Sequence, residues 1–259
     1  MKIAIDAGHG LHTAGKRCLK SLDPNQTREW VLNNRIASQV AKHLTRCHAV
    51  VIRLDDSTGE TDVALDRRSG RANENGCDFC VSIHHNAGIR GGNGGGPVVY
   101  VYSGKHSAKA DELQANVYEG LVDAVGAFGN RSNPLTASSL HMVRKTKMPA
   151  ILVEVGFMDS KTDVPLILDE TWAAKAAEGI ARGIVKTAGL TWVEPFYLVR
   201  ITANELNVRG GPGVKYTATA RVKRGEVFTI VEERYNGETL WGKLKSGKGW
   251  VSLKYTEKV

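Results

Sequence analysis

The chain of 259 residues has no long hydrophobic run, few cysteines and few prolines. No apolar stretch approaches the roughly 20 residues that a membrane-spanning helix requires, so we expect no membrane insertion. The four cysteines are too few for a disulfide scaffold, and Cys77 and Cys80 lack the second ligand pair of a structural zinc site. Only seven prolines, with 42% apolar and 24% charged residues, exclude a disordered or collagen-like chain.

The first residues also lack the pattern of a secretion signal. The apolar stretch that begins at Met1 is interrupted at Asp6, before a hydrophobic segment of about 7 residues can form. We therefore expect a protein that is cytoplasmic when made and has no signal peptide.

The composition changes near residue 190. All eight histidines precede this point, whereas nine of the 17 aromatic residues lie in the last 70 positions. Most of the net charge of +8 also belongs to the last part, because residues 190–259 carry 12 basic and 7 acidic side chains, a net +5. We therefore expect a catalytic domain at residues 1–188, a linker at 189–196 and a smaller, basic domain at 197–259.

The first part has the pattern of an α/β domain with a mostly parallel sheet flanked by helices. Short β-branched runs predict strands at residues 2–6, 49–54, 79–84, 98–102 and 151–155. Apolar residues recur every four positions in 32–44, 113–125 and 172–184, which predicts helices that face the sheet. The last part has only short alternating segments between glycine-containing turns, which is typical of a small all-β barrel.

Three polar side chains stand where a packed core alone would not place them. His9 follows the first strand on a glycine-flanked turn, Glu29 heads the apolar stripe of the first helix, and His84 ends the third run. Ligands of α/β sheets bind at the carboxyl ends of strands. For each residue alone, the alternative is structural: a hydrogen-bonded histidine at a strand end, or a glutamate that reaches solvent beside the stripe.

A fourth polar residue, Glu154, interrupts the apolar strand 151–157. Burial of an isolated carboxylate costs several kcal/mol, so we expect Glu154 to be paired, protonated or close to a metal. Two histidines and one carboxylate form a common catalytic zinc shell, and a further glutamate outside the shell can act as general base.

The order of these residues resembles the zinc-dependent N-acetylmuramoyl-L-alanine amidases of the amidase type 3 family. The matching segments span about residues 1–188 and are 5–10, Arg28-Glu29, 65–73, 82–87 and 148–157. The resemblance implies that His9, Glu29 and His84 bind Zn²⁺ and that Glu154 is the catalytic carboxylate. It leaves open whether neighbouring His85 replaces His84, whether His141 contacts substrate and whether Asp6 orients a ligand or only forms the turn.

Residues 197–257 resemble a bacterial SH3-like domain, through 203–213, 222–227, 249–252 and Tyr255. Such domains are often appended to cell-wall enzymes, and the +5 charge favours an anionic cell-wall polymer as a partner. Trp241, Trp250 and Phe228 either stack on a wall ligand or fill the small core.

The resemblances together imply hydrolysis of the amide between N-acetylmuramic acid and L-alanine in peptidoglycan. A zinc peptidase that cuts within the stem peptide is the alternative. We expect no nucleic-acid partner, since no helix carries a basic stripe.

A wall hydrolase without a signal peptide is typical of a phage endolysin released through a pore or by lysis. A host enzyme used at lysis or sporulation is the alternative, and the sequence leaves the oligomeric state open.

Overall fold

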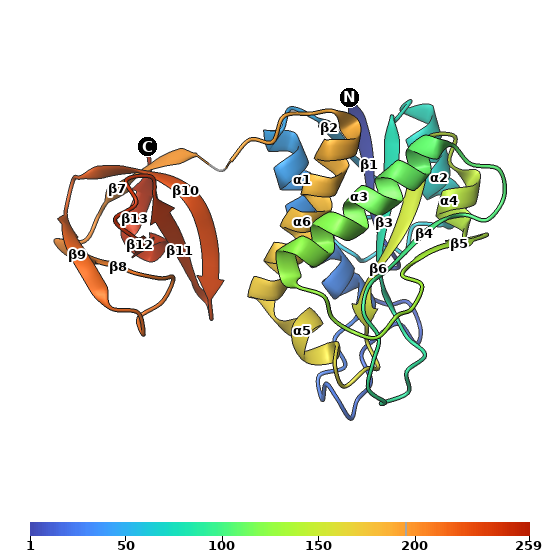
Figure 1. Ribbon diagram of the computed structural model, residues 1–259, viewed down its shortest axis with the longest axis horizontal. Helices are drawn as coiled ribbons and strands as arrows, with labels where there is room; N and C mark the ends of the chain where they lie inside the picture. The colour runs from blue at the N-terminus through green and yellow to red at the C-terminus, as the bar shows by residue number, and fades with distance from the viewer. Residues whose placement is uncertain (195) are drawn as a thin grey trace. The chain divides into compact units, whose positions relative to one another are not determined.

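A computed structural model describes residues 1–194 and 196–259. The described chain divides into two compact units, Met1–Trp192 and Val193–Val259 (Figure 1). The expected linker, residues 189–196, includes Pro195, which lies outside the described residues. The four cysteines are free and buried. Within the described residues, no helix has both the length and the hydropathy of a membrane span.

The first unit is built on a six-stranded sheet with the order β2-β1-β3-β6-β4-β5. The strands are β1 (Lys2–Ala7), β2 (Val50–Arg53), β3 (Phe79–Asn86), β4 (Val98–Tyr102), β5 (Leu135–Ser138) and β6 (Ala150–Phe157). All neighbouring strands run parallel except β4 and β6. The predicted mostly parallel sheet is confirmed, and β5 is a strand that the sequence pattern did not indicate.

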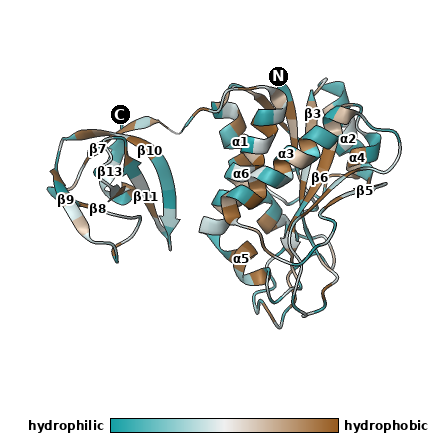
Figure 2. Cartoon of the chain, viewed as in Figure 1, coloured by the Kyte–Doolittle hydropathy of each residue, from teal (hydrophilic) through white to brown (hydrophobic). Residues whose placement is uncertain are grey.

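Six helices accompany this sheet: α1 (Glu29–Arg46), α2 (Leu65–Glu74), α3 (Ala108–Val125), α4 (His141–Lys145), α5 (Val164–Leu168) and α6 (Glu170–Ala188). The three predicted helices are confirmed as α1, α3 and α6, which bury their apolar stripes and present polar residues on the opposite sides (Figure 2). Helix α6 packs against both α1 and α3. Glycines allow its close approach to α3, because a Cβ on Gly179 would lie 2.2 Å from the carbonyl oxygen of Gly120.

The central strands of this sheet place His9, His84 and Glu154 at the same edge of the sheet. Strands β1, β3 and β6 are adjacent and parallel, so their carboxyl ends lie together. Helix α1 begins at Glu29 and contacts both β1 and β3. In the register of the sheet, His84 on β3 lies opposite Glu154 on β6. The topology thus places three distant segments of sequence beside one another.

The second unit is a seven-stranded antiparallel sheet with the order β13-β7-β10-β11-β12-β8-β9. Its strands are β7 (Tyr197–Ile201), β8 (Glu205–Arg209), β9 (Ala218–Lys223), β10 (Val227–Asn236), β11 (Thr239–Leu244), β12 (Trp250–Ser252) and β13 (Thr256–Lys258). Trp241 and Trp250 are only 4% and 8% exposed, and Phe228 packs against the apolar core. These three aromatic rings therefore serve the interior of this small unit.

Candidate functional site

The structure brings His9, Glu29 and His84 together at the carboxyl edge of the sheet. One candidate ligand atom from each side chain lies within 4.8 Å of the other two. His9 Nε2 is 3.4 Å from Glu29 Oε1, and His84 Nδ1 is 3.1 Å from the same oxygen. The three residues come from the turn after β1, the first position of α1 and the end of β3. They form a single compact group that can hold a metal ion.

Two local backbone features place the imidazoles of this group. His9 adopts a left-handed conformation with φ of 65°, which is uncommon for a residue that has a Cβ. Gly8, next to it, leaves room for the His84 ring, because a Cβ at Gly8 would lie 2.0 Å from His84 Cε1. The two rings then meet edge to face, with centroids 5.0 Å apart. The turn after β1 is thus shaped around both histidines.

Arg68 of α2 holds the turn in this conformation. Its guanidinium donates to the His9 carbonyl at 2.8 Å, to the Ala7 carbonyl at 2.7 Å and to Asp6 Oδ1 at 2.8 Å. Arg68 and Asp6 are each only 1% exposed, so the ion pair is buried. Asp6 also accepts a hydrogen bond from Ser82 Oγ at 2.6 Å. Asp6 is therefore connected to His9 through the hydrogen bonds of Arg68 and through the main chain. Its carboxylate forms no hydrogen bond with a histidine ring among the described residues.

Glu29 has a buried side chain that is held ionised. Burial by itself would raise its pKa, but hydrogen bonds from His84 and His9 outweigh this effect and keep the pKa well below its usual range. Its second oxygen, Oε2, is buried and has no hydrogen-bond partner among the described residues. The ammonium of Lys16 lies 3.7 Å from this oxygen. Two imidazoles and a carboxylate with a spare buried oxygen fit a divalent metal ion.

Glu154 lies beside this group and has a different protonation behaviour. Burial, together with the negative charge of Glu29, raises its pKa to about 7, although His84 acts in the opposite direction. Glu154 Oε2 is buried and has no hydrogen-bond partner among the described residues. A carboxyl group with a pKa near neutrality can both accept and donate a proton. The pKa values of the two glutamates thus shift in opposite directions, because Glu29 accepts hydrogen bonds from two histidines and Glu154 Oε2 has no hydrogen-bond partner among the described residues.

The other histidines of interest lie outside the metal-capable group. His85 is 2% exposed, and its Nδ1 lies 2.8 Å from Asn33 Oδ1 on α1. Burial lowers the pKa of His85 to about 3, so its ring is neutral. His141 Nε2 lies 3.1 Å from Ser69 Oγ and 3.5 Å from Asp66 Oδ1. His85 and His141 therefore have structural contacts of their own.

Some residues of this region have contacts that the sequence did not predict. Gly8 and Arg68 lie in segments that carry the family resemblance, but their contacts with His84 and with the His9 turn were not predicted, and Lys16 was not indicated at all. Asn33 carried a usable signal, since it lies four residues after Glu29 and so shares its side of the helix. Its amide donates to the Gly8 carbonyl at 3.0 Å.

The fold and the site define a two-domain protein whose α/β unit carries a metal-capable group at the carboxyl edge of its sheet. Comparison with known families identifies the family. Residues 3–186 match the family described as N-acetylmuramoyl-L-alanine amidase, and residues 204–257 match the bacterial SH3 domain. The chain belongs to this amidase family and carries a bacterial SH3 domain. It hydrolyses peptidoglycan as an amidase, so the alternative of a stem-peptide peptidase is not supported.

Individual relatives agree with this assignment. A sporulation-specific N-acetylmuramoyl-L-alanine amidase of Bacillus subtilis (strain 168) is 31% identical over 205 residues, 78% of this chain and 75% of the relative. An endolysin of Bacillus phage SPP1 is 29% identical over 188 residues, 72% of this chain and 65% of the relative. The solved structure of the amidase AmiC2 of Nostoc punctiforme matches with a TM-score of 0.64 and 26% identity, covering 73% of this chain and 97% of that chain.

Proposed function

We propose that the amidase is zinc-dependent and that His9, Glu29 and His84 hold the ion. The observation that carries this proposal is the convergence of three ligand atoms within 4.8 Å of one another. Two nitrogen donors and one carboxylate oxygen form a donor set typical of catalytic zinc. Zinc bound there would supply Lewis acidity toward water and toward the amide carbonyl. His84 rather than His85 is the ligand in this proposal, because among the described residues His84, and not His85, brings a ring nitrogen into the group formed with His9 and Glu29.

Glu154 is the proton carrier of the proposed reaction. An uncharged amide is a poor electrophile, so the attacking water needs a base and the leaving nitrogen of L-alanine needs a proton. With its pKa raised to about 7, Glu154 can accept the proton of the water and then donate it to the nitrogen. Its buried Oε2 supports this role, because no group among the described residues forms a hydrogen bond with that oxygen.

The second unit binds the cell wall in this proposal. The catalytic domain comprises residues 1–188, the linker 189–196 and the wall-binding domain 197–259. The net charge of +5 on residues 190–259 favours association with anionic wall polymers. This attraction is screened by salt, so wall binding should weaken as ionic strength rises.

The biological role that we propose is that of an endolysin, which acts on the wall after release through a pore or by lysis. The similarity to the endolysin of Bacillus phage SPP1 supports this role, and the similarity to a sporulation-specific amidase supports the alternative of a host enzyme. Expression inside a Gram-positive host distinguishes them. An endolysin lyses the cells promptly once a pore-forming agent opens the membrane, whereas absence of lysis after pore formation contradicts the role.

Mass spectrometry of fragments released from purified walls tests the catalytic proposal. The wild-type chain should release stem peptides with a free N-terminal alanine, whereas Glu154→Ala should release none while it retains zinc. Activity that survives complete removal of metal would contradict the zinc assignment.

A further inference from the structure

The segment between β1 and α1 places a lysine beside the metal-capable group. The main-chain carbonyl of Lys16 accepts a hydrogen bond of 3.0 Å from the amide of Glu29, the first residue of α1. The next residue, Arg17, forms an isolated antiparallel bridge with Arg28. These main-chain bonds fix Lys16 against the start of the helix that carries Glu29.

The side chain of Lys16 turns back toward the same glutamate. Its ammonium nitrogen lies 3.7 Å from Glu29 Oε2, and its side chain is 44% exposed whereas that of Glu29 is 1% exposed. A separation of 3.7 Å exceeds the length of a hydrogen bond, and the ammonium group forms no hydrogen bond among the described residues. Three N–H donors therefore stand at the boundary between the buried group and solvent, available to a molecule that enters.

Lys16 also acts on the second glutamate of the site. Its positive charge lowers the pKa of Glu154, against the effects of burial and of the negative charge of Glu29. The guanidinium of Arg68 is not available in the same way, because it donates to three carbonyls and to two carboxylates. Lys16 is thus a cation with unused donors beside both acidic side chains.

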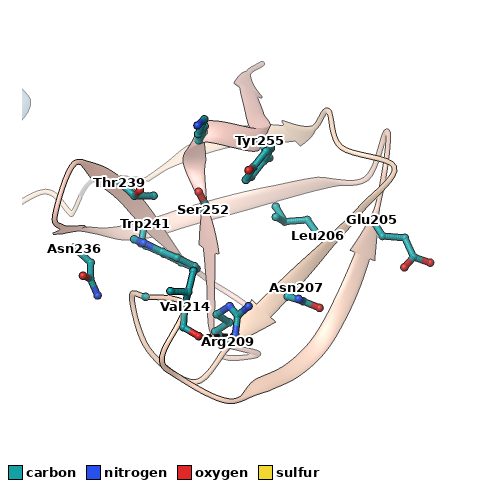
Figure 3. A pocket seen from close by; sticks show the side chains of 12 residues that line it. Glu205, Leu206, Asn207, Arg209, Val214, Asn236, Thr239, Trp241, Ser252 and Tyr255 are labelled. Carbon is teal, nitrogen blue, oxygen red and sulfur yellow. Dashed lines mark hydrogen bonds between the residues drawn. The ribbon is translucent and has the colours of Figure 1, made fainter.

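The charge balance at Lys16 differs from that in the cavity of the second unit. That cavity, of about 400 Å³, is lined by two cations, Arg209 and Lys254, and by one carboxylate, Glu205 (Figure 3). At Lys16 the balance is reversed, because one ammonium group lies beside two largely buried carboxyl groups. A cation in that position bears on the chemistry of the site more than on general attraction to an anionic wall.

Amide hydrolysis creates negative charge in this acidic surrounding. When water adds to the carbonyl carbon, a C–O bond forms and the electron pair of the carbonyl double bond moves onto its oxygen. Glu29 is held ionised nearby, and repulsion from this carboxylate raises the energy of the new anion. A hydrogen-bond donor with positive charge, placed where the anion forms, offsets this repulsion and speeds the reaction.

We propose that Lys16 is a catalytic residue that donates a hydrogen bond to the carbonyl oxygen of the scissile amide. The ammonium group stabilises the negative charge on that oxygen and keeps its own proton throughout. Glu154 accepts the proton of the water and passes it to the leaving nitrogen as the C–N bond breaks and the carbonyl double bond forms again. This inference rests on the proposed role of Glu154 as proton carrier and adds the group that faces the oxygen.

Steady-state kinetics on a soluble N-acetylmuramoyl peptide that begins with L-alanine test the proposal. Lys16→Met should lower kcat by about 10²- to 10³-fold and leave KM nearly unchanged, because the lost interaction forms mainly in the transition state. Lys20→Met, at an exposed lysine of the same segment, is the matched control and should behave like the wild type. A raised KM with normal kcat would show that Lys16 contacts another part of the substrate, which overturns the proposal.

Zinc affinity separates catalysis from support of the metal-capable group. Competition with a chelator should show that Lys16→Met binds zinc at least as tightly as the wild type, because a neighbouring positive charge has been removed. Its kcat should stay low at saturating zinc. A variant that binds zinc more weakly and regains full activity at saturating zinc would show that the lysine only supports Glu29, contrary to the proposal.

Chemical rescue tests the need for the ammonium group itself. In Lys16→Cys, alkylation with 2-bromoethylamine restores an ammonium group of similar length, and the four native cysteines are buried, which directs the reagent to position 16. The modified variant should regain most of the lost kcat, whereas alkylation with neutral iodoacetamide should restore none. Equal rescue by both reagents, or by neither, refutes the requirement for a positive charge.

Glu154→Ala, assayed on the same substrate, keeps this inference apart from the proposed function. Full activity of Lys16→Met beside an inactive Glu154→Ala overturns the role of Lys16 and leaves the proton carrier intact. Full activity of both variants overturns both assignments.

Discussion

The guanidinium of Arg68 and the main-chain carbonyl of His9 are joined by a buried hydrogen bond of 2.8 Å. The same guanidinium neutralises Asp6, so one side chain couples an internal ion pair to the turn that carries a candidate metal ligand. The left-handed backbone of His9 is thereby held by the second helix of the domain. Stability of the core and geometry of the site depend on the same residue.

Arg68→Met should therefore destabilise the catalytic unit by about 3–5 kcal/mol, because it leaves the Asp6 carboxylate buried without its cation. Denaturant unfolding of the intact chain measures this loss. The double variant Asp6→Asn/Arg68→Met should recover part of the stability, since it removes the unpaired charge. A double variant as unstable as the sum of the two single variants would contradict a direct coupling between these residues.

Glu154→Ala should reduce the rate of amide hydrolysis by about 10²- to 10⁴-fold, because the water and the leaving nitrogen lose their proton carrier. Zinc content by elemental analysis should stay at the wild-type value. The exposed Glu74→Ala on α2 is the matched control and should keep full activity. Near-normal hydrolysis in Glu154→Ala would remove this residue from the catalytic role.

Glu29→Ala should weaken zinc binding by more than about tenfold. Mutation of a residue that only forms a hydrogen bond with a metal ligand typically lowers metal affinity by about 10- to 100-fold. Glu29 offers a donor atom of its own to the metal-capable group, so its loss should cost at least as much. Competition with a chromogenic chelator measures the dissociation constant without reference to activity. Glu60→Ala, whose exposed carboxylate contacts His12, is the control. Equal zinc affinities in the two variants would count against Glu29 as a ligand.

Gly8→Ala should lower activity by about 10²-fold, because the new Cβ would lie 2.0 Å from His84 Cε1 and the ring must move. Displacements of about 1 Å at a catalytic centre have effects of this size. Gly70→Ala in α2 is the matched control, since its Cβ would meet only Glu74 Oε1 at 3.8 Å. Hydrolysis assays on purified walls compare the two. Equal activities would show that the His84 position tolerates a methyl group at residue 8.

The catalytic unit should also lose stability on acidification through His43. Burial, together with the nearby Arg46 and Arg182 cations, lowers the pKa of His43 to about 4, and its ring stacks on Trp192. The folded state therefore takes up this proton less readily than the unfolded state, whose histidine has its ordinary pKa near 6.5. The contribution is fully present above about pH 6.5 and is lost as the pH falls toward 4.

Thermal unfolding between these pH values checks the His43 effect. The midpoint of His43→Asn should fall less steeply with pH than that of the wild type. His48→Asn is the control, because His48 is exposed and its left-handed backbone accepts asparagine. Parallel pH profiles for wild type and His43→Asn would exclude His43 as a source of acid sensitivity.

The sequence by itself determined the fold class and the candidate residues of the site. Hydrophobic periodicity marked five strands and three helices, because burial of apolar side chains imposes a local repeat that survives in the linear chain. Polar interruptions at Glu29 and Glu154 were visible for the same reason. Strand β5 and helices α4 and α5 were not indicated, since they are only four or five residues long and leave little periodic signal. Helix α2 was not indicated either, because its buried residues are Arg68, Ser69 and Ala72, which form no apolar stripe.

Only the tertiary structure decided how these residues act on one another. Burial would raise the pKa of Glu29, but hydrogen bonds from two histidines lower it, whereas burial and the negative charge of Glu29 raise the pKa of Glu154 to about 7. The hydrogen bonds from Arg68 to the turn after β1 and the space that Gly8 leaves for the His84 ring likewise depend on segments that are distant in sequence. Electrostatic and steric effects depend on distances between atoms, and those distances exist only once the chain has folded.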